Sequence, residues 1–452
     1  MTRYIKFNIL ILAVCLSFTI KAQQNDSQLT DNSIDELNAI VDDLVNQARD
    51  QSRLSEFKNL KKLVSKPFNS TPLFLQTLES LKLAEEKKNE IFARYLPRVT
   101  SSVGGGVKSG GLNNKSSSQS LNLNVTQLVY DFGVTKRQLS AATEEALASQ
   151  SKVESQRTDL LLAIISAVHE LYRAEMQLRL SQGFVDARKG FLDSTKQREE
   201  LGGSSNADVI RAETKLSEAL DKIPLQVRIL KDSQAKLLEF FINETREISL
   251  TRLPVIAPEA FSINEDTVNK NFKIKELVKQ VSAASLNFEA EKRNSFGSFN
   301  IQAGYQNTDT NLLSPQEQSS LLLTYQVNIF TGFEKSSKIA QAGFRVNALQ
   351  FELERIKLAL KTELSQSANS FNAQSASVIS RAELVNGAKL SNNVNKELFE
   401  LNKTSINDLF RSQEEYITAA KNLVDAMVDR NISFYKMLAN FGLLLDMFDL
   451  GV

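Results

Sequence analysis

Two exceptionally long proline-free stretches constrain what this chain can fold into. The 452 residues include only 7 prolines, and residues 134–200 and 333–400 contain none of them. A helix rises 1.5 Å per residue, so either stretch would be roughly 100 Å long if it were helical throughout. A helix of that length needs a coiled coil, a membrane or a tubular wall to pack against. We therefore expect a mainly α-helical architecture built around these two stretches.

Each long stretch is preceded by two runs in which apolar and polar residues alternate. The first pair covers residues from about 98–108 and 119–130, and the second covers about 298–307 and 319–330. Alternation with a period of two predicts strands, and runs of roughly ten residues match a tilted strand that crosses a bilayer. The sequence therefore predicts two hairpins of membrane length.

The two halves of the sequence repeat one another. Gly133, at the corner between strand and helix, lies 199 residues before Gly332 at the corresponding corner. The passage LGGSSNADVIRAETKLSEA begins at Leu201, and LNKTSINDLFRSQEEYITA begins 200 residues later at Leu401. Turns and strands that recur in the same order indicate two homologous halves rather than a chance likeness between amphipathic helices.

These patterns divide the chain into five parts. The predicted parts are a signal peptide (1–22), an N-terminal helical segment (23–72), a first repeat (73–247) with a long helix over 134–200 and a return helix over 207–241, an inter-repeat linker (248–265), and a second repeat (266–448) with a long helix over 333–400 and a return helix over 406–448.

The segment 1–22 has the layout of a secretory signal peptide. Arg3 and Lys6 precede an apolar core from Ile9 to Ile20, which is too short to cross a bilayer, and cleavage is expected after Ala22. Lipidation at Cys15 is the alternative, but the residue before this cysteine is bulky. No later apolar run approaches the length of a helical transmembrane span, so we expect none.

Composition argues against several classes of function. The full chain carries a net charge of +1, and without residues 1–22 the charge is about −2, so nucleic-acid binding has no support. The single cysteine leaves with the signal peptide, so neither a disulfide framework nor a cysteine metal site is expected. The only histidine, His169, has helical spacing among apolar residues and is interpreted as a packed or partly exposed side chain rather than a ligand. We predict neither an enzyme nor a cofactor.

The strand–corner–helix passages LVYDFGVTKRQLSAA and VNIFTGFEKSSKIAQA, together with the two turn–helix passages quoted above, carry a family resemblance. From about residue 70 to residue 448, the chain resembles the outer membrane efflux protein family, the TolC-like exit ducts of bacterial tripartite exporters. Four strands cannot close a membrane barrel, since about eight are needed, so strands in a membrane would require oligomerisation. Three copies would give twelve strands and two copies would give eight.

The resemblance implies a homotrimer with a 12-stranded β-barrel in the outer membrane above an α-helical barrel that crosses the periplasm. Outer-membrane lipid would surround the strands. A periplasmic adaptor (membrane fusion) protein and an inner-membrane transporter would be the partners, and no nucleic acid would be bound. The implied function is a passive exit duct for drug and solute efflux or for type I protein secretion.

In relatives, acidic side chains at the start of the final helix narrow the closed tunnel. The matching position here is Asp408, and Arg411 lies one turn later, where it can pair with that acid or cancel its charge. A ring of three Asp408 carboxylates would attract cations. The alternative is that Asp408 is a first-turn acid favoured by the helix dipole.

The two turns between long and return helices would form the periplasmic tips that meet the adaptor. The candidate contacts are Gly202, Gly203, Lys403 and Thr404. The glycines can also be explained as a helix stop, and the second turn has no glycine. Gly133 and Gly332 would mark the passage from barrel to tunnel.

A different class of function is also compatible with the long helices. They would suit a soluble periplasmic coiled-coil scaffold or adaptor, which needs no membrane strands. The four alternating runs argue against this alternative, because a scaffold has no use for strands of bilayer length.

Overall fold

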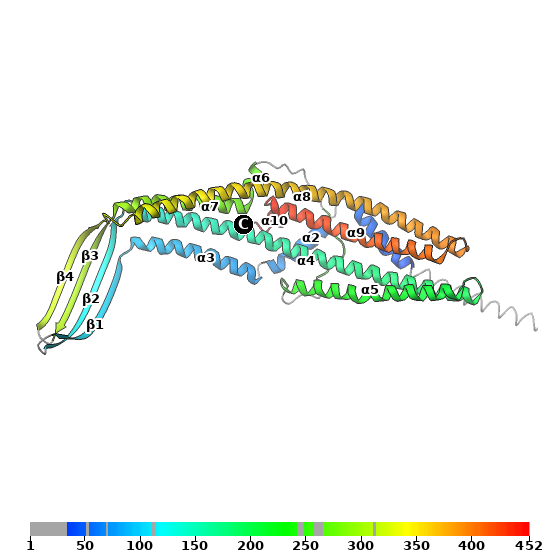
Figure 1. Ribbon diagram of the computed structural model, residues 1–452, viewed down its shortest axis with the longest axis horizontal. Helices are drawn as coiled ribbons and strands as arrows, with labels where there is room; N and C mark the ends of the chain where they lie inside the picture. Colours follow the sequence, from blue (N-terminus) through cyan, green and yellow to red (C-terminus); the bar gives the residue numbers. More distant parts are fainter. Residues whose placement is uncertain are drawn as a thin grey trace, which may run out of the picture. The chain divides into compact units, whose positions relative to one another are not determined.

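A computed structural model describes residues 34–50, 54–68, 71–110, 114–241, 248–255, 265–310 and 313–451. The predicted signal peptide, Cys15 and the middle of the predicted linker lie outside the described residues. The described chain is mostly helical and contains one small sheet, as the sequence predicts (Figure 1). Besides a helix over residues 34–49, the elements are α2 (Leu54–Phe68), α3 (Pro72–Phe92), η1 (Ala93–Tyr95), β1 (Arg98–Gly110), β2 (Asn114–Tyr130), α4 (Val134–Glu200), α5 (Asn206–Leu238), α6 (Glu265–Lys270), α7 (Phe272–Arg293), η3 (Asn294–Phe296), β3 (Ser298–Thr310), β4 (Leu313–Gln326), α8 (Glu334–Glu400), α9 (Ile406–Asn440) and α10 (Leu444–Met447).

The chain forms two compact units. The helical unit is drawn from Met1–Thr71, Thr158–Ser262 and Glu363–Val452, and the sheet unit consists of Pro72–Arg157 and Ile263–Thr362. Each unit therefore takes part of each predicted repeat, and the long helices α4 and α8 contribute residues to both. The compact units consequently cut across the division into repeats.

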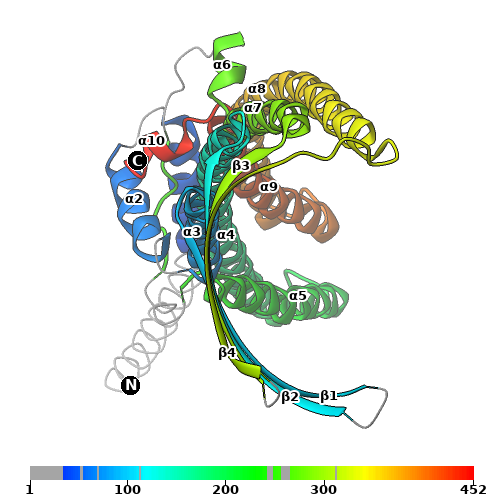
Figure 2. The same ribbon diagram turned by 90° about the vertical axis from the view of Figure 1, so that its left-hand side faces the viewer.

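The sheet unit holds four antiparallel strands in the order β1-β2-β3-β4, which curve together in Figure 2. The register places apolar side chains next to one another across the sheet, as in the row Val99, Val125, Ala303 and Leu321. The opposite face is mostly polar, with rows such as Asn122 beside Gln306. Many of the apolar side chains are solvent-exposed, so nothing in the described chain covers this face. These exposed residues are Val99, Val103, Val107, Leu121, Leu123, Ile301, Leu321, Leu323 and Tyr325.

The strand ends differ from the prediction in two ways. At the loop end, pairing continues to Gly110↔Asn114 and Thr310↔Leu313, so the hairpins are longer than the alternation suggested. At the helix end, β4 stops at Gln326 instead of continuing to about residue 330. The physical reason is that Gln326 pairs with Ser298, the first residue of β3, so the described chain offers no strand partner for the next residues.

The return helices also end earlier than predicted. The helix α5 ends at Leu238 rather than 241, and Pro224 lies inside it without ending it. The helix α9 ends at Asn440 rather than 448, because Gly442 adopts a left-handed backbone (φ +71°) and separates it from the short α10. A glycine in this conformation is a common helix stop.

The elements of the two halves recur at a constant offset in the numbering. The helix α4 runs from Val134 to Glu200 and α8 from Glu334 to Glu400, and β1 and β3 show the same offset. At the corners, Phe132 and Gly133 are left-handed (φ +55° and +79°), as are Gly332 and Phe333 (φ +58° and +68°). The predicted match of Gly133 with Gly332 is therefore wrong by one residue: Gly133 is equivalent to Phe333, and Phe132 is equivalent to Gly332. Each corner has two consecutive left-handed residues, one glycine and one phenylalanine, in opposite order.

The core of the helical unit lies where α9 packs on its neighbours. Along α9 the buried positions include Leu409, Tyr416, Leu423 and Met427, whereas much of α8 is exposed. His169, which the sequence left as packed or partly exposed, is fully buried; its Nδ1 lies 2.8 Å from the carbonyl oxygen of Ile165, and burial lowers its pKa to about 4. Among the described helices, none is apolar over a length sufficient to span a bilayer.

One glycine at the base of the sheet gives a sharp test of this packing. Gly297 has φ +82°, and a Cβ placed there would lie 2.3 Å from the carbonyl oxygen of Gln326. The substitution Gly297→Ala should therefore separate β3 from β4, in addition to about 1–3 kcal/mol of strain in a backbone region that essentially only glycine enters. We expect a clearly lower thermal unfolding midpoint for the purified protein. The control is Gly106→Ala, because no atom lies within 4 Å of a Cβ there; equal midpoints for the two variants would contradict this prediction.

Candidate functional site

The two helix–turn–helix ends of the helical unit have the same backbone structure. In the α4–α5 turn, the backbone N–H of Gly203 donates to the carbonyl oxygen of Arg198 (2.7 Å). In the α8–α9 turn, the N–H of Lys403 donates in the same way to Leu398 (2.8 Å). This bond, together with a left-handed residue before its donor, is the Schellman helix stop.

The second turn achieves this stop without glycine. Asn402 adopts φ +56°, where Gly202 of the first turn has φ +77°. Asparagine is one of the few residues with a side chain that enter this region readily. The side-chain oxygen of Asn402 also accepts a hydrogen bond from Nη2 of Arg198 at 2.6 Å. Asn402 therefore takes the place of the glycine that the second turn lacks, and the two turns have equivalent backbones.

Both return helices start with the same cap. The Ser205 hydroxyl accepts from the backbone N–H of Asp208, and the Ser405 hydroxyl accepts likewise from Asp408, each at 3.2 Å. Each serine hydroxyl in turn donates to the carboxylate of its aspartate, at 2.8 Å and 2.7 Å. Capping alone thus accounts for an acid at position 408.

An arginine about one turn after each capping aspartate pairs with it. Arg411 lies 3.0 Å from Asp408, and Arg211 lies 3.6 Å from Asp208. The pairing of Asp408 with Arg411 that the sequence suggested is therefore present, but it also occurs at the other turn. A role of these residues in a pore constriction stays a prediction.

Arg198, in the last turn of α4, links the two turns. Its guanidinium donates to the carbonyl oxygens of Glu400, Phe399 and Gly203 at 3.3–3.4 Å, as well as to Asn402. It also lies 4.9 Å from the centre of the Phe399 ring. A planar fork of donors suits this multiple contact, which a lysine could not reproduce. Sequence reasoning missed Arg198; the only local signal was a basic residue at a helix C-terminus.

A small apolar core supports the turns. The ring of Phe191 lies 5.6 Å from that of Phe399 and 5.4 Å from that of Phe410. Around them are the buried residues Leu192, Val209, Ala212, Ile406 and Leu409. Of the predicted contact residues, Gly202, Gly203 and Lys403 are exposed and Thr404 is half-buried. The turns thus present a preorganised surface on a packed base.

Deeper in the same unit, Arg188 joins α4 to α9. Its side chain is fully buried between the rings of Phe184 and Phe410, at 4.7 Å and 4.6 Å, and lies 3.3 Å from Glu414. Burial lowers the pKa of Arg188 to about 10, although Glu414 counteracts this effect. The carboxylate of Glu414 also lies 3.6 Å from Lys222 of α5. This cluster, which sequence reasoning missed, links α4, α9 and α5 through ion pairs of Glu414 with the buried Arg188 and with Lys222.

At the first corner of the sheet unit, Asp131 caps α4. Its carboxylate accepts from the backbone N–H groups of Gly133 (3.0 Å) and Thr135 (2.6 Å), and the ring of Phe132 packs against Phe296 at 5.6 Å. The second corner, at Gly332 and Phe333, has no equivalent of Phe296, because no further strand follows it in the described chain. There Phe330 and Phe333 lie 6.2 Å apart, and both are largely exposed (79% and 77%).

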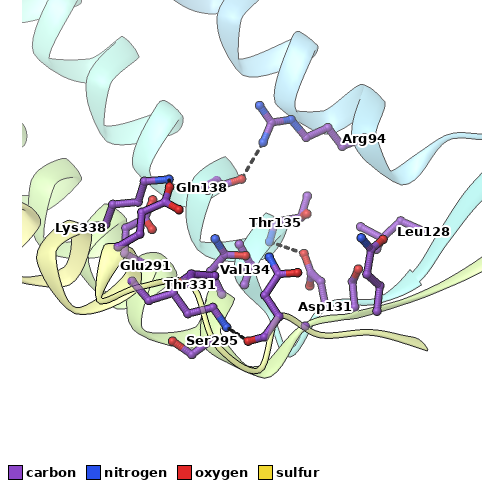
Figure 3. A pocket seen from close by; sticks show the side chains of 17 residues that line it. Arg94, Leu128, Asp131, Val134, Thr135, Gln138, Glu291, Ser295, Thr331 and Lys338 are labelled. Atoms are coloured by element: carbon purple, nitrogen blue, oxygen red, sulfur yellow. Dashed lines mark hydrogen bonds and ion pairs between the residues drawn. The ribbon is translucent and has the colours of Figure 1, made fainter. Parts of the chain in front are cut away.

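A hollow of about 490 Å³ lies between the two corners, on the polar face of the sheet (Figure 3). Its charged lining is balanced, with three basic side chains and three acidic ones: Arg94, Lys335, Lys338, Asp131, Glu291 and Glu334. Arg94 donates to Gln138 (2.7 Å), and Lys335 donates to the carbonyl oxygen of Asn328 (2.6 Å). Among the described residues, no group of three or more His, Cys, Asp or Glu side chains could hold a metal ion. The hollow is therefore a polar surface lined by charges of both signs.

Comparison with known proteins agrees with this geometry. Residues 69–240 match the sequence model of the outer membrane efflux protein family. The Campylobacter jejuni CmeC outer membrane channel has the same fold, with a TM-score of 0.76 and 12% identity over 85% of this chain and 86% of that one. The open-state Neisseria gonorrhoeae MtrE outer membrane channel gives a TM-score of 0.74 and 15% identity, over 85% and 89% of the two chains.

The family match over residues 69–240 and the fold together make this chain similar to the outer membrane efflux proteins. More particularly it is TolC-like: it is 22% identical over 405 residues to outer membrane protein TolC of Vibrio cholerae, across 86% of this chain and 91% of the relative. The matched family consists of efflux proteins rather than enzymes. The matched family, this relative and the two structural neighbours are all outer membrane proteins by name.

The contacts of Arg198 lead to a prediction about the two turns. The substitution Arg198→Ala should loosen the α8–α9 turn, because it removes the donors to Phe399, Glu400 and Asn402. We expect trypsin to cleave after the exposed Lys403 several-fold faster, as measured by mass spectrometry of timed digests. Arg198→Lys should fall between the alanine variant and the parent protein.

The matched control is Arg211→Ala, since Arg211 is also exposed and its ion pair with Asp208 is the longer one. If cleavage after Lys403 were equally fast in both alanine variants, Arg198 would not be what orders the turn.

Proposed function

We propose that this chain is the passive exit duct of a tripartite export system, and that it works as a homotrimer. The observation that carries the proposal is the four-stranded sheet with one exposed apolar face, one polar face and two open edges, joined to helices of 67 residues. An apolar exterior with a polar interior is the arrangement of a membrane barrel that encloses water.

The open edges favour an assembly of several copies. Unpaired backbone groups cost several kcal/mol each in lipid, so β1 and β4 need partners there. Four strands per copy make twelve in a trimer, which encloses a water-filled bore, whereas eight in a dimer would be filled by side chains. The trimer therefore fits an exit duct better than the dimer.

The length of the helices suits the periplasmic part of such a duct. A helix of 67 residues extends roughly 100 Å at 1.5 Å per residue. Because α8 exposes large apolar side chains such as Phe344, Phe351 and Leu358, spaced seven residues apart, its surface suits packing against further helices. Neighbouring copies would supply these helices.

The two turns are the proposed contact points for the partners. We place a periplasmic adaptor protein at Gly202, Gly203, Lys403 and Thr404, which lie on the surface ordered by Arg198. An inner-membrane transporter would supply the energy and select the cargo, either drugs and solutes or a secreted protein. Gly133 and Gly332 would mark the passage from barrel to tunnel.

A soluble periplasmic scaffold or adaptor is the competing function. It would leave the apolar face of the sheet in water, where a patch of this kind is a liability. Membrane fractionation separates the two functions: the duct should be recovered with the outer membrane, as a trimer in detergent that conducts ions across planar bilayers. A monomer confined to the soluble periplasmic fraction would refute the duct.

The pore role proposed for Asp408 can be separated from its capping role. Asp408→Asn and Asp208→Asn remove the same charge from the same local structure, because both aspartates cap a helix and pair with an arginine. If Asp408 lines a constriction, only Asp408→Asn should lower the cation preference of the channel, measured as the reversal potential in a salt gradient.

The companion variant Arg411→Ala should raise that cation preference, since it releases the carboxylate from its ion pair. Equal effects of Asp408→Asn and Asp208→Asn would assign both residues to capping alone.

A further inference from the structure

The helix over residues 34–49 contacts four parts of the helical unit, and we call it the strap helix. It precedes residues 69–240, which the family model matches, so that match assigns it no role. Resting on the proposed duct, we propose that the strap helix is a conformational lock. It fastens α8 to the first half of the chain, and its release lets the α8–α9 pair turn away from α4 and widen the inner end of the duct.

One face of the strap helix is an apolar stripe. Its members recur at helical spacing and are at most 5% exposed: Leu37, Val41, Leu44, Val45 and Ala48. Burial of an apolar stripe supplies most of the stability of a helix in a folded protein. The strap helix is therefore bound to the helical unit by packing.

Gly183 of α4 allows the strap helix to approach closely. A Cβ at this position would lie 3.2 Å from Cδ1 of Leu37, which is tighter than ordinary van der Waals contact. Glycine destabilises the interior of a helix, and the close approach of Leu37 explains its presence in α4. The equivalent residue of α8 is Glu383, which pairs with Arg49 of the strap helix at 2.7 Å. The strap helix thus meets both long helices at equivalent positions.

Two adjacent carboxylates of the strap helix bind cations from different parts of the chain. Lys389 of α8 donates to both carboxylate oxygens of Asp42, at 2.6 Å and 2.8 Å. Arg252, in the segment 248–255, donates to Asp43 at 2.6 Å. A single exposed ion pair contributes little to stability. Several such directional contacts together nevertheless fix one position of the strap helix on its neighbours.

Two tyrosines attach the strap helix near its two ends. The Tyr416 hydroxyl of α9, which lies beside the strap helix in Figure 1, donates to the side-chain oxygen of Asn38 at 2.9 Å. The Tyr172 hydroxyl of α4 donates to Gln47 at 3.3 Å. One short helix is thereby joined to α4, α8, α9 and the segment 248–255.

The strap helix provides a second line of attachment for the α8–α9 pair. The first line is the seam between α4 and α9, where Arg173 lies 2.5 Å from Asp429 and Arg188 lies 3.3 Å from Glu414. Contacts along one seam leave rotation about that seam free, and contacts on α8, away from the seam, block it. Apart from Arg198 at the turns, the strap helix supplies these contacts.

The contacts of the strap helix lie close enough to the turns to control their movement. Lys389 precedes the end of α8 at Glu400, and Tyr416 follows the start of α9 at Ile406. Each separation corresponds to roughly 15 Å along a helix. Because the paired helices move as a rigid body, an attachment at this distance limits how far the turn between them can move.

A charge exchange tests the lock. Lys389→Glu places two carboxylates opposite each other and should release the strap helix. In planar bilayers, the full-length trimer should then spend several-fold more time in its high-conductance state. Asp42→Lys combined with Lys389→Glu restores an ion pair and should return the channel to the parent level. The control is Lys357→Glu, which makes the same change on α8 but breaks only an ion pair with Glu354 of the same helix.

A second pair of variants leaves every charge unchanged. Gly183→Leu forces a side chain into the space that Leu37 occupies, whereas Gly387→Leu adds the same side chain to α8 where no atom lies within 4 Å of a Cβ. Hydrogen–deuterium exchange of residues 34–49 reports the release directly. We expect several-fold faster exchange and more time at high conductance in Gly183→Leu, as in Lys389→Glu, and neither change in the control.

The outcomes separate the lock from the duct. Unchanged exchange in both release variants would overturn the lock, as would faster exchange in a trimeric channel of unchanged conductance; the duct would stay intact in both cases. Equal conductance changes in the controls, or no rescue by the double variant, would also overturn the lock. A parent protein that is a non-conducting monomer would overturn the duct itself. If Gly183→Leu fails to fold, the charge exchange between the partly exposed Asp42 and Lys389 tests the same lock.

Discussion

The structure depends on one constraint, which is that every backbone N–H and C=O group in lipid must have a hydrogen-bond partner. Within the described chain, three pairs of neighbouring strands are hydrogen-bonded to each other, namely β1–β2, β2–β3 and β3–β4. The outer edges of β1 and β4 are left without partners from the described chain. The early end of β4 follows from the lack of a strand partner at this edge. In the proposed membrane role, the two edges would require further copies.

The two halves share local structure but differ in what their side chains hold together. The Schellman stops, the serine caps and the aspartate–arginine pairs recur at equivalent positions of both halves. The tertiary links do not: Arg188 and Arg198 both lie on α4, and the equivalent residues of α8 are Ala388 and Leu398. Residues that recur in both halves therefore form the helix ends, whereas Arg188 and Arg198, which occur in one half only, join the helices to one another.

Sequence reasoning succeeded where the signal is local. The ends of α4 follow from a left-handed corner at Gly133 and a glycine stop at Gly202, both of which act within a few residues. It failed where the cause lies elsewhere in the chain or outside it. The end of β4 depends on the length of β3, and the contacts of Arg198 depend on a turn in the other half of the chain. At the candidate site, the helix stop at Gly202 was predictable from the sequence, whereas the links that Arg198 and Arg188 make between helices were not.

The free edges also bear on how the protein reaches its final state. A folded single copy would carry two unpaired strand edges beside a bare apolar face, which is the template for uncontrolled aggregation. In the proposed duct, such a copy would be prone to aggregation while it crosses the periplasm. Insertion into the bilayer and encounter with further copies would then proceed together, so that the lifetime of the lone copy would limit the yield of the channel.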